Sequence, residues 1–306
     1  MTYGHRAAEA GHRRLNAEAA AAVGLPAVMR RGAGDRHVRI AIVDGPVQDH
    51  PLLDQAPIVS LPVPEPPGAD DGARAHGTFV AGILAAPRGS AAPAISPGCT
   101  LLVRPIRTGA AASLPPAPDR LADAILDCVR ARADVINLGL VLSAPADRAG
   151  RLAEALTLAA RQGAIVVAAA GDERTPGGSV VSRHPWVLPV VAAGLSGAPL
   201  STAALSASTG RRGVAAPGRV ASLGPDAGLL VRTGSSFAAA VVTGVVALLR
   251  SLVPAAPAAA VRAAVAATAP RGRSTVPPVL DAAAAYTLLT SGQSRHFPLS
   301  RSFRHA

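Results

Sequence analysis

Short, mainly apolar runs of residues alternate along this chain with longer amphipathic segments. The runs span residues 39–43, 101–104, 134–138, 164–170 and 187–193, and helical patterns begin near residue 78 and span 119–132 and 147–161. Because the runs lack polar alternation, they are typical of strands that are buried on both faces, as in a parallel sheet covered by helices. The pattern therefore predicts an α/β fold with a doubly wound, mainly parallel sheet and helices on both faces.

Three parts are expected along the 306 residues. An Ala-rich segment predicts an N-terminal helical arm over residues 1–23, followed by a short helical segment that ends near Arg31. The main domain spans residues 24–290 and includes a long helix from Ser236 to about residue 252 and further helices over 257–267 and 281–289. Residues 291–306 form a basic tail that is expected to fray.

The composition excludes several classes of protein. Hydrophobic residues make up 49% of the chain and charged residues 16%, which excludes intrinsic disorder. Aromatic residues make up only 2%, too few for the base-stacking surfaces of single-strand binders. All 30 cationic residues are Arg, and an Ala-rich, Lys-free chain indicates GC-biased coding as the source of the net charge of +11. We therefore expect neither a nucleic-acid nor a membrane partner.

Cysteine content and apolar stretches bear on the compartment. Cys99 and Cys128 are too few for a disulfide framework or a four-ligand zinc site, so both are expected to be small buried residues. The first thirty residues carry charges throughout, and stretches such as 164–170 and 245–249 are far shorter than the ~20 residues that cross a bilayer. These features predict a cytoplasmic protein and leave its oligomeric state open.

Three polar residues stand where the chemistry of an α/β protein is usually found. Asp44 ends the first strand, His76 is expected to open a helix, and Ser236 begins the long helix. Taken singly, each has a structural explanation, as a turn former, a solvated helix terminus or an N-cap. Together they supply a hydroxyl nucleophile, its general base and a carboxylate that orients the base. The helix N-terminus at Ser236 also directs backbone N–H groups toward developing negative charge.

The segments around these residues resemble the motifs of the subtilisin-like serine peptidases. Residues 42–47 read Ile-Val-Asp-Gly-Pro-Val, with His50-Pro51 after them, and are similar to the family's Asp motif. Residues 76–82 match its His motif H-G-T-x-V-A-G in full, and residues 234–238 match its Ser motif G-T-S-[MF]-A with Ser235 in place of Thr. The chain order Asp, His, Ser is also the order known for subtilisin.

The resemblance covers about residues 24–289 and implies a subtilisin-like three-layer fold and a peptide or protein substrate, with no metal or organic cofactor. It implies an oxyanion region at Ser236 and Asp172. The substrate-binding residues that it implies lie on two segments: Asn137, Gly139, Leu140, Val141 and Gly171. Three features resemble those of the cyanobactin-type maturation proteases, which cut precursors of ribosomally made, modified peptides. They are the D-G-P-V sequence at Asp44, the turn at 96–99 and Phe237.

Two departures from the family pattern bear on activity. Asp172 stands where the family has an Asn that donates a hydrogen bond to the oxyanion, and an ionised carboxylate donates none. Asp172 is either protonated, which requires a strongly raised pKa, or turned away, which leaves the Ser236 amide to act alone. Residues 139–142 read Gly-Leu-Val-Leu instead of S-L-G-G, which predicts a narrow substrate pocket. The sequence thus favours a serine endopeptidase, and the alternative is a catalytically weak or silent relative that binds a peptide or partner.

Overall fold

The structure is a computed structural model that describes residues 3–63, 71–106, 117–139, 150–171, 179–200, 212–267 and 277–291. The predictions for Leu140, Val141 and Asp172, and for the tail beyond residue 291, lie outside these residues.

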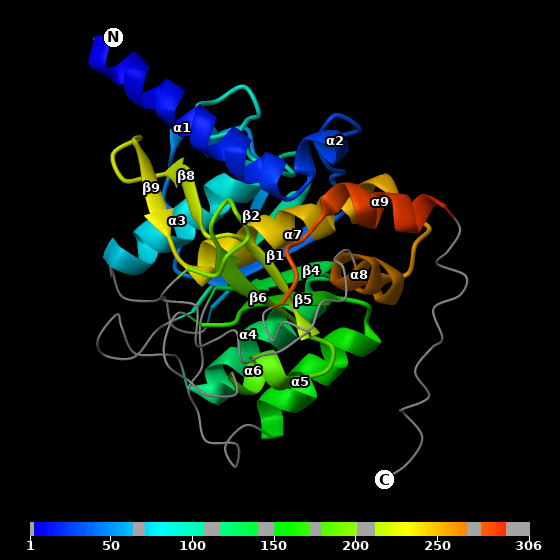
Figure 1. Ribbon diagram of the computed structural model, residues 1–306. Coiled ribbons are helices and arrows are strands. Elements are labelled where there is room, and N and C mark those ends of the chain that lie inside the picture. Colours follow the sequence, from blue (N-terminus) through cyan, green and yellow to red (C-terminus); the bar gives the residue numbers. More distant parts are fainter. Residues whose placement is uncertain are drawn as a thin grey trace.

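Seven strands form one parallel sheet at the centre of the molecule (Figure 1). In spatial order they are β2 (Ile58–Ser60), β3 (Thr100–Pro105), β1 (Arg39–Asp44), β4 (Val135–Leu138), β5 (Ile165–Ala169), β6 (Leu188–Ala193) and β7 (Val214–Pro217). Every residue of β4, β5 and β6 is buried, which is why their sequences show no polar alternation. The predicted α/β fold is confirmed.

Strand β1 marks the point where the order of the strands reverses. It pairs with β3 on one side and with β4 on the other, so the chain builds outward from β1 first in one direction and then in the other. At such a point the connections diverge and leave a crevice beyond the carboxyl ends of the strands. Asp44 is the last residue of β1 and therefore lies at this crevice.

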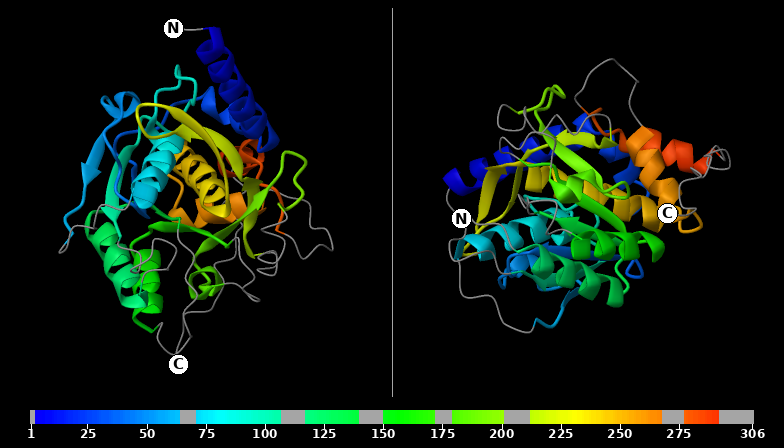
Figure 2. Two further views of the ribbon diagram at one scale, coloured as in Figure 1. Left: turned by 90° about the vertical axis from the view of Figure 1, so that its left-hand side faces the viewer. Right: turned by 90° about the horizontal axis from the view of Figure 1, so that it is seen from below.

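Helices cover both faces of the sheet (Figures 1 and 2). On one face, α7 (Ser235–Leu252) packs against β4 to β7 and is joined by α3 (Asp71–Ala85), α8 (Ala258–Ala267) and α9 (Ala282–Thr290). On the other face lie α4 (Pro118–Arg130), α5 (Gly150–Arg161) and α6 (Val180–Arg183). Among the described residues, α7 alone is long and apolar enough to cross a bilayer, but most of it is buried as the core helix of this layer.

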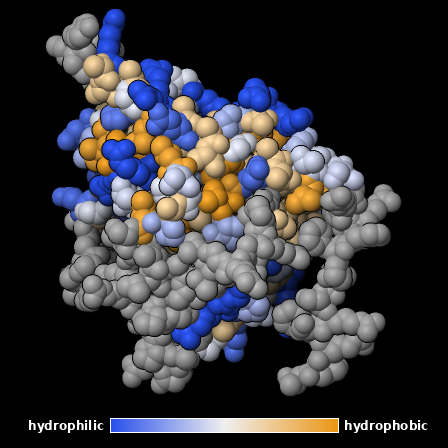
Figure 3. All heavy atoms as spheres, viewed as in Figure 1, coloured by the Kyte–Doolittle hydropathy of each residue, from blue (hydrophilic) through white to orange (hydrophobic). Residues whose placement is uncertain are grey.

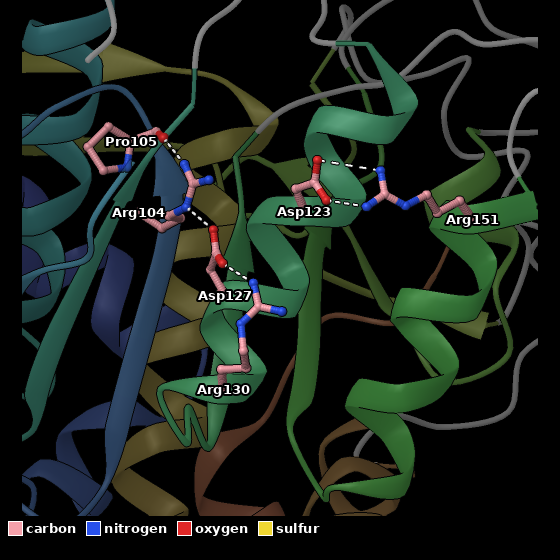
Figure 4. Close-up of polar contacts among 6 residues, drawn as sticks. All are labelled: Arg104, Pro105, Asp123, Asp127, Arg130 and Arg151. Atoms are coloured by element: carbon pink, nitrogen blue, oxygen red, sulfur yellow. Dashed lines mark hydrogen bonds and ion pairs between the residues drawn. The ribbon is translucent and has the colours of Figure 1, made fainter. Parts of the chain in front are cut away.

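Ion pairs connect β3 with α4 and α4 with α5 (Figure 4). The guanidinium of Arg104 on β3 donates to Asp127 on α4 at 2.7 Å, and Asp127 also pairs with Arg130 one turn later. Asp123 on α4 pairs with Arg151 on α5. The Arg104 side chain is 7% exposed, so its pair is shielded from solvent, whereas the Asp123–Arg151 pair is exposed and contributes little to stability.

The second half of the chain contains strands that its sequence does not reveal. No strand is predicted between residue 193 and Ser236, but this part of the chain contains β7 and an antiparallel hairpin of β8 (Arg219–Leu223) and β9 (Leu229–Thr233). These strands are short and bounded by glycines. Gly218 between β7 and β8 passes so close to β6 that a Cβ atom there would lie 2.5 Å from the Cβ of Ala192.

The N-terminal arm is helical, as predicted, and packs on the hairpin. Helix α1 (Tyr3–Ala22) lies along β8, and α2 (Leu25–Met29) follows it (Figure 2). The side-chain amide of Asn16 donates to the carbonyl of Ala221 at 2.8 Å, and its oxygen accepts from the N–H of Ala221 at 2.8 Å. Ala19 and Val23 belong to the main core. The arm therefore shares the core of the domain that follows it.

The paired contacts of Asn16 predict a stability effect. Replacing Asn16 with alanine removes two hydrogen bonds and leaves the backbone of Ala221 without partners, so the free energy of unfolding should fall by about 1–3 kcal/mol. Urea denaturation measures this change. Glu18→Ala is the control, because it breaks only the exposed Arg14–Glu18 pair and should change nothing measurable. Equal stability of both variants would contradict the role given to Asn16.

Candidate active site

Three side chains from distant parts of the sequence form one hydrogen-bonded chain. The Nδ1 atom of His76 lies 2.7 Å from Oδ1 of Asp44, and its Nε2 atom lies 2.9 Å from Oγ of Ser236. With a neutral imidazole, Nδ1–H donates to the carboxylate and Nε2 accepts the hydroxyl proton of Ser236. The three sequence-predicted residues are thus brought together at hydrogen-bond distances.

Glycines allow the end of β1 to approach helix α3 closely. A Cβ atom on Gly45 would overlap the carbonyl of Ala73, and one on Gly77 would overlap the carbonyl of Gly45. Thr78 connects the two segments further, because its hydroxyl oxygen accepts a hydrogen bond from the N–H of Gln48 at 2.9 Å. The glycines that follow Asp and His in the two motifs therefore act by letting Asp44 and His76 meet.

The placement of His76 corrects one expectation from the sequence. Helix α3 begins at Asp71, so His76 lies in its second turn and does not open the helix. Asp71 in the first turn favours this earlier start, because a negative charge there interacts well with the helix dipole. Gly77 lies within the helix although glycine has a low helix propensity. A glycine is needed there because the close contact with Gly45 leaves no room for a side chain.

The carboxylate of Asp44 is buried and held through one oxygen. Its residue is 1% exposed, and Oδ1 accepts from His76 and from the N–H of Gly45 at 2.7 Å. Oδ2 is buried and has no hydrogen-bond partner among the described residues. A Cβ atom on Gly139, just after β4, would lie 2.6 Å from Oδ2 and 3.4 Å from Cε1 of His76. Gly139 therefore lies directly beside these side chains.

Opposing influences act on the pKa of His76. Burial of the ring lowers it, but the negative charge of Asp44 and the hydrogen bond to it together raise it more, and the cation of Arg232 lowers it slightly. The net result is a pKa above the ordinary histidine value. Asp44 thus favours the imidazolium that a general base becomes when it takes a proton.

This raised pKa predicts the acidic side of the pH profile. Since only the neutral ring accepts a proton from Ser236, kcat/KM for peptide hydrolysis should fall as the pH drops through the raised pKa of His76. Arg232→Gln removes a cation that lowers this pKa, so the fall should move to higher pH. Profiles of kcat/KM against pH for both proteins test this. A fall at an unchanged or lower pH in the variant would contradict it.

Ser236 lies at the positive end of the core helix. It is the second residue of α7 and is 9% exposed. Gly234 precedes the helix, and its N–H donates to the carbonyl of Gly218 at 3.1 Å. Backbone N–H groups in a first helical turn have no acceptor within the helix, so they can stabilise negative charge near the hydroxyl. The ring of Phe237 lies 5.1 Å from the ring of His76, and Phe79 lies 4.6 Å from Phe237.

The other predicted site residues have different placements. Asn137 is fully buried in β4 and its Oδ1 accepts from the hydroxyl of Thr243 on α7 at 2.9 Å. This side chain joins the sheet to the core helix, and a contact of Asn137 with substrate stays a prediction. Gly171 is buried just after β5 with φ +100°, a backbone conformation that favours glycine. Leu140, Val141 and Asp172 lie outside the described residues.

The cysteines are buried free thiols in the described part of the chain. Burial raises the pKa of Cys128 to about 12 and also raises that of Cys99. Both therefore remain protonated and unreactive at neutral pH, as the sequence predicts for small buried residues. No three His, Cys, Asp or Glu side chains within the described ranges are grouped so that they could hold a metal ion.

Sequence reasoning missed the aromatic and cationic surroundings of His76. Phe79 is three residues after His76 and so shares its helix face, a spacing that is visible in the sequence. Arg232 has no such signal, because β9 was not predicted and its contact with α3 arises only through the hairpin.

Comparisons with known proteins identify the family and agree with the fold. The model of the subtilase family matches residues 35–295. The prenylagaramide maturation protease PagA is 28% identical to this chain, with a TM-score of 0.76. The match covers 87% of this chain and 99% of PagA. The patellamide maturation protease PatA is 30% identical, with a TM-score of 0.72 and coverages of 85% and 99%. The patellamide maturation protease PatG, at 21% identity and a TM-score of 0.74 over 88% and 96% of the chains, shares the fold.

No curated protein sequence matches the chain. The family match covers most of its length. The solved structures given above are cyanobactin maturation proteases. The chain belongs to the subtilase family and is related to the maturation proteases of cyanobactin precursor peptides.

Proposed function

We propose that the protein is a serine endopeptidase with Ser236 as nucleophile, His76 as general base and then acid, and Asp44 as the carboxylate that orients His76. The observation that carries this proposal is the continuous hydrogen bonding from Asp44 through both ring nitrogens of His76 to Ser236. Membership of the subtilase family supports it.

The geometry accounts for each step of peptide hydrolysis. Oγ of Ser236 attacks the peptide carbonyl while Nε2 of His76 takes its proton, and the buried carboxylate of Asp44 stabilises the resulting imidazolium. The oxyanion forms at the N-terminal end of α7, where the amide of Ser236 donates to it. His76 then gives its proton to the leaving amine, and a water molecule activated by the same ring releases the acyl group from Ser236.

An extended peptide is the substrate that we propose. It would lie along the crevice beyond β4 and β5, near Gly139, Leu140, Val141 and Gly171. The names of the related PagA and PatA proteins as maturation proteases support a precursor peptide of a modified natural product. We also propose a cytoplasmic location, which the charged residues among the first thirty positions support.

The role of Asp172 separates two forms of the proposal. If it lies in the oxyanion region as a charged group, Asp172→Asn replaces a repulsive carboxylate with a donor and should raise kcat by up to about 10²–10³-fold, the range known for this donor in subtilisin. Asp172→Ala removes the repulsion without adding a donor and should give a smaller rise. Unchanged kcat in both variants would show that Asp172 takes no part in catalysis.

The alternative function is a silent relative that binds peptide through the same crevice, which Asp172 and Val141 favour. Incubation of the purified protein with a peptide library, followed by mass spectrometry, separates the two. New peptide termini that appear with the wild-type protein and are absent with Ser236→Ala support the endopeptidase. Peptides recovered intact but bound, with no new termini, support the alternative and contradict the proposal.

A further inference from the structure

Arg232 lies beside the candidate active site on the strand that leads into it. It belongs to β9, four residues before Ser236, and pairs with Val220 of β8 in the hairpin that covers α3 (Figure 1). Its guanidinium carbon is 5.6 Å from the centre of the Phe79 ring. The rings of Phe79, Phe237 and His76 follow one another from there at 4.6 and 5.1 Å.

The charge of Arg232 is not neutralised within the part of the chain that the structure describes. None of the ion pairs between described residues includes it, although its side chain is only partly exposed. Other arginines in the same layers have acidic partners, such as Arg250 with Asp134 at 2.7 Å. An unpaired cation that rests on an aromatic ring is well placed to receive an anion from outside, because stacking holds the guanidinium while its edge remains free.

The position of Arg232 indicates which part of a peptide it would meet. Gly139 abuts the Asp44–His76 pair at the end of β4, where the substrate is proposed to lie. Arg232 is linked to His76 from the hairpin, because it contacts the ring of Phe79, which contacts Phe237, which in turn contacts His76. The space-filling view shows apolar and charged residues side by side along the hairpin and α1 (Figure 3). A peptide that lies along β4 and continues past His76 toward the hairpin would bring its leaving part to Arg232.

We propose that Arg232 is a specificity-determining residue that selects an aspartate or glutamate within the first two residues after the cleaved bond. This inference rests on the proposed endopeptidase function. The acidic side chain would pair with the edge of the guanidinium, and the pair would hold the leaving part in position while His76 protonates its amine.

Matched peptides test this proposal. From a peptide that the wild-type protein cleaves, two versions are made that differ only by Asp or Asn after the cleaved bond, at each of the two positions. We expect kcat/KM to be about tenfold higher for Asp than for Asn at one position in the wild-type protein, as for a charge-assisted hydrogen bond. In Arg232→Gln the ratio should fall to about one, and Arg232→Lys should retain part of it.

Arg219→Gln is the matched control, because it removes the same charge from the same hairpin. Arg219 is exposed and pairs with Thr233, so its side chain points to the opposite face of the hairpin from Arg232. It should keep the preference for Asp. A ratio near one in the wild-type protein, or an equal loss in both variants, would overturn the role of Arg232 while leaving the endopeptidase intact. Failure of the wild-type protein to cleave any library peptide would instead overturn the proposed function and this inference with it.

Discussion

Alanine at position 236 is expected to lower kcat for peptide hydrolysis by about six orders of magnitude, the loss known for the equivalent serine of subtilisin. Ser236 is placed to act as nucleophile by its 2.9 Å contact with Nε2 of His76. The residual rate should come only from binding and from the backbone amides at the start of α7. Rates of a cleaved library peptide measure the change.

The folded structure should survive this substitution, because the change removes one oxygen atom from a residue at the helix start. Thermal unfolding of the variant is therefore expected near that of the wild-type protein. Ser60→Ala is the control, since Ser60 is an exposed residue on the edge strand β2 and should leave kcat unchanged. Substantial hydrolysis by Ser236→Ala would contradict the assignment of the nucleophile.

The second large effect is expected at Gly139, which contains no catalytic atom. In Gly139→Ala the added Cβ would lie 2.6 Å from Oδ2 of Asp44, closer than real carbon–oxygen contacts allow, so the carboxylate or the end of β4 must move. Among the residues that the structure describes, Asp44 is held only through Oδ1, and its displacement would release the ring of His76. We expect kcat to fall by about 10³–10⁴-fold, approaching the loss when the aspartate of a Ser-His-Asp triad is replaced.

Gly89→Ala is the matched control for this substitution, because a Cβ atom at Gly89 has no neighbour within 4 Å. It should leave both kcat and the unfolding midpoint unchanged. A Gly139→Ala protein that is folded and as active as the wild-type protein would show that Asp44 does not need the space beside Oδ2.

Most of the fold could be predicted from the sequence because buried parallel strands leave a strong pattern. The runs at β1, β3, β4, β5 and β6 are mainly apolar, and helical segments separate β1 from β3, β3 from β4 and β4 from β5. Strands β8 and β9 left no such pattern, since β9 is largely exposed and both strands are bounded by glycines. Their position depends on contacts with α1 and α3, which lie far away in the sequence.

The candidate site was predictable for the residues that carry chemistry and less so for those around them. Asp44, His76 and Ser236 were identified by the order of their motifs and by their positions next to a strand end or near a helix start. The sequence did not show that Gly139 abuts Asp44, or that Asn137 accepts a hydrogen bond from Thr243. Such neighbours depend on the register between strands and helices, which a single sequence does not reveal.

Reaction with a fluorophosphonate tests the central claim, that His76 activates Ser236, without requiring a known substrate. Oγ of Ser236 bonds to phosphorus as fluoride leaves, and mass spectrometry locates the added mass. The account predicts one label on Ser236 in the wild-type protein, none in Ser236→Ala, and labelling slowed by about 10²–10⁴-fold in His76→Ala. No labelling of the wild-type protein, or labelling of His76→Ala at the wild-type rate, would contradict it.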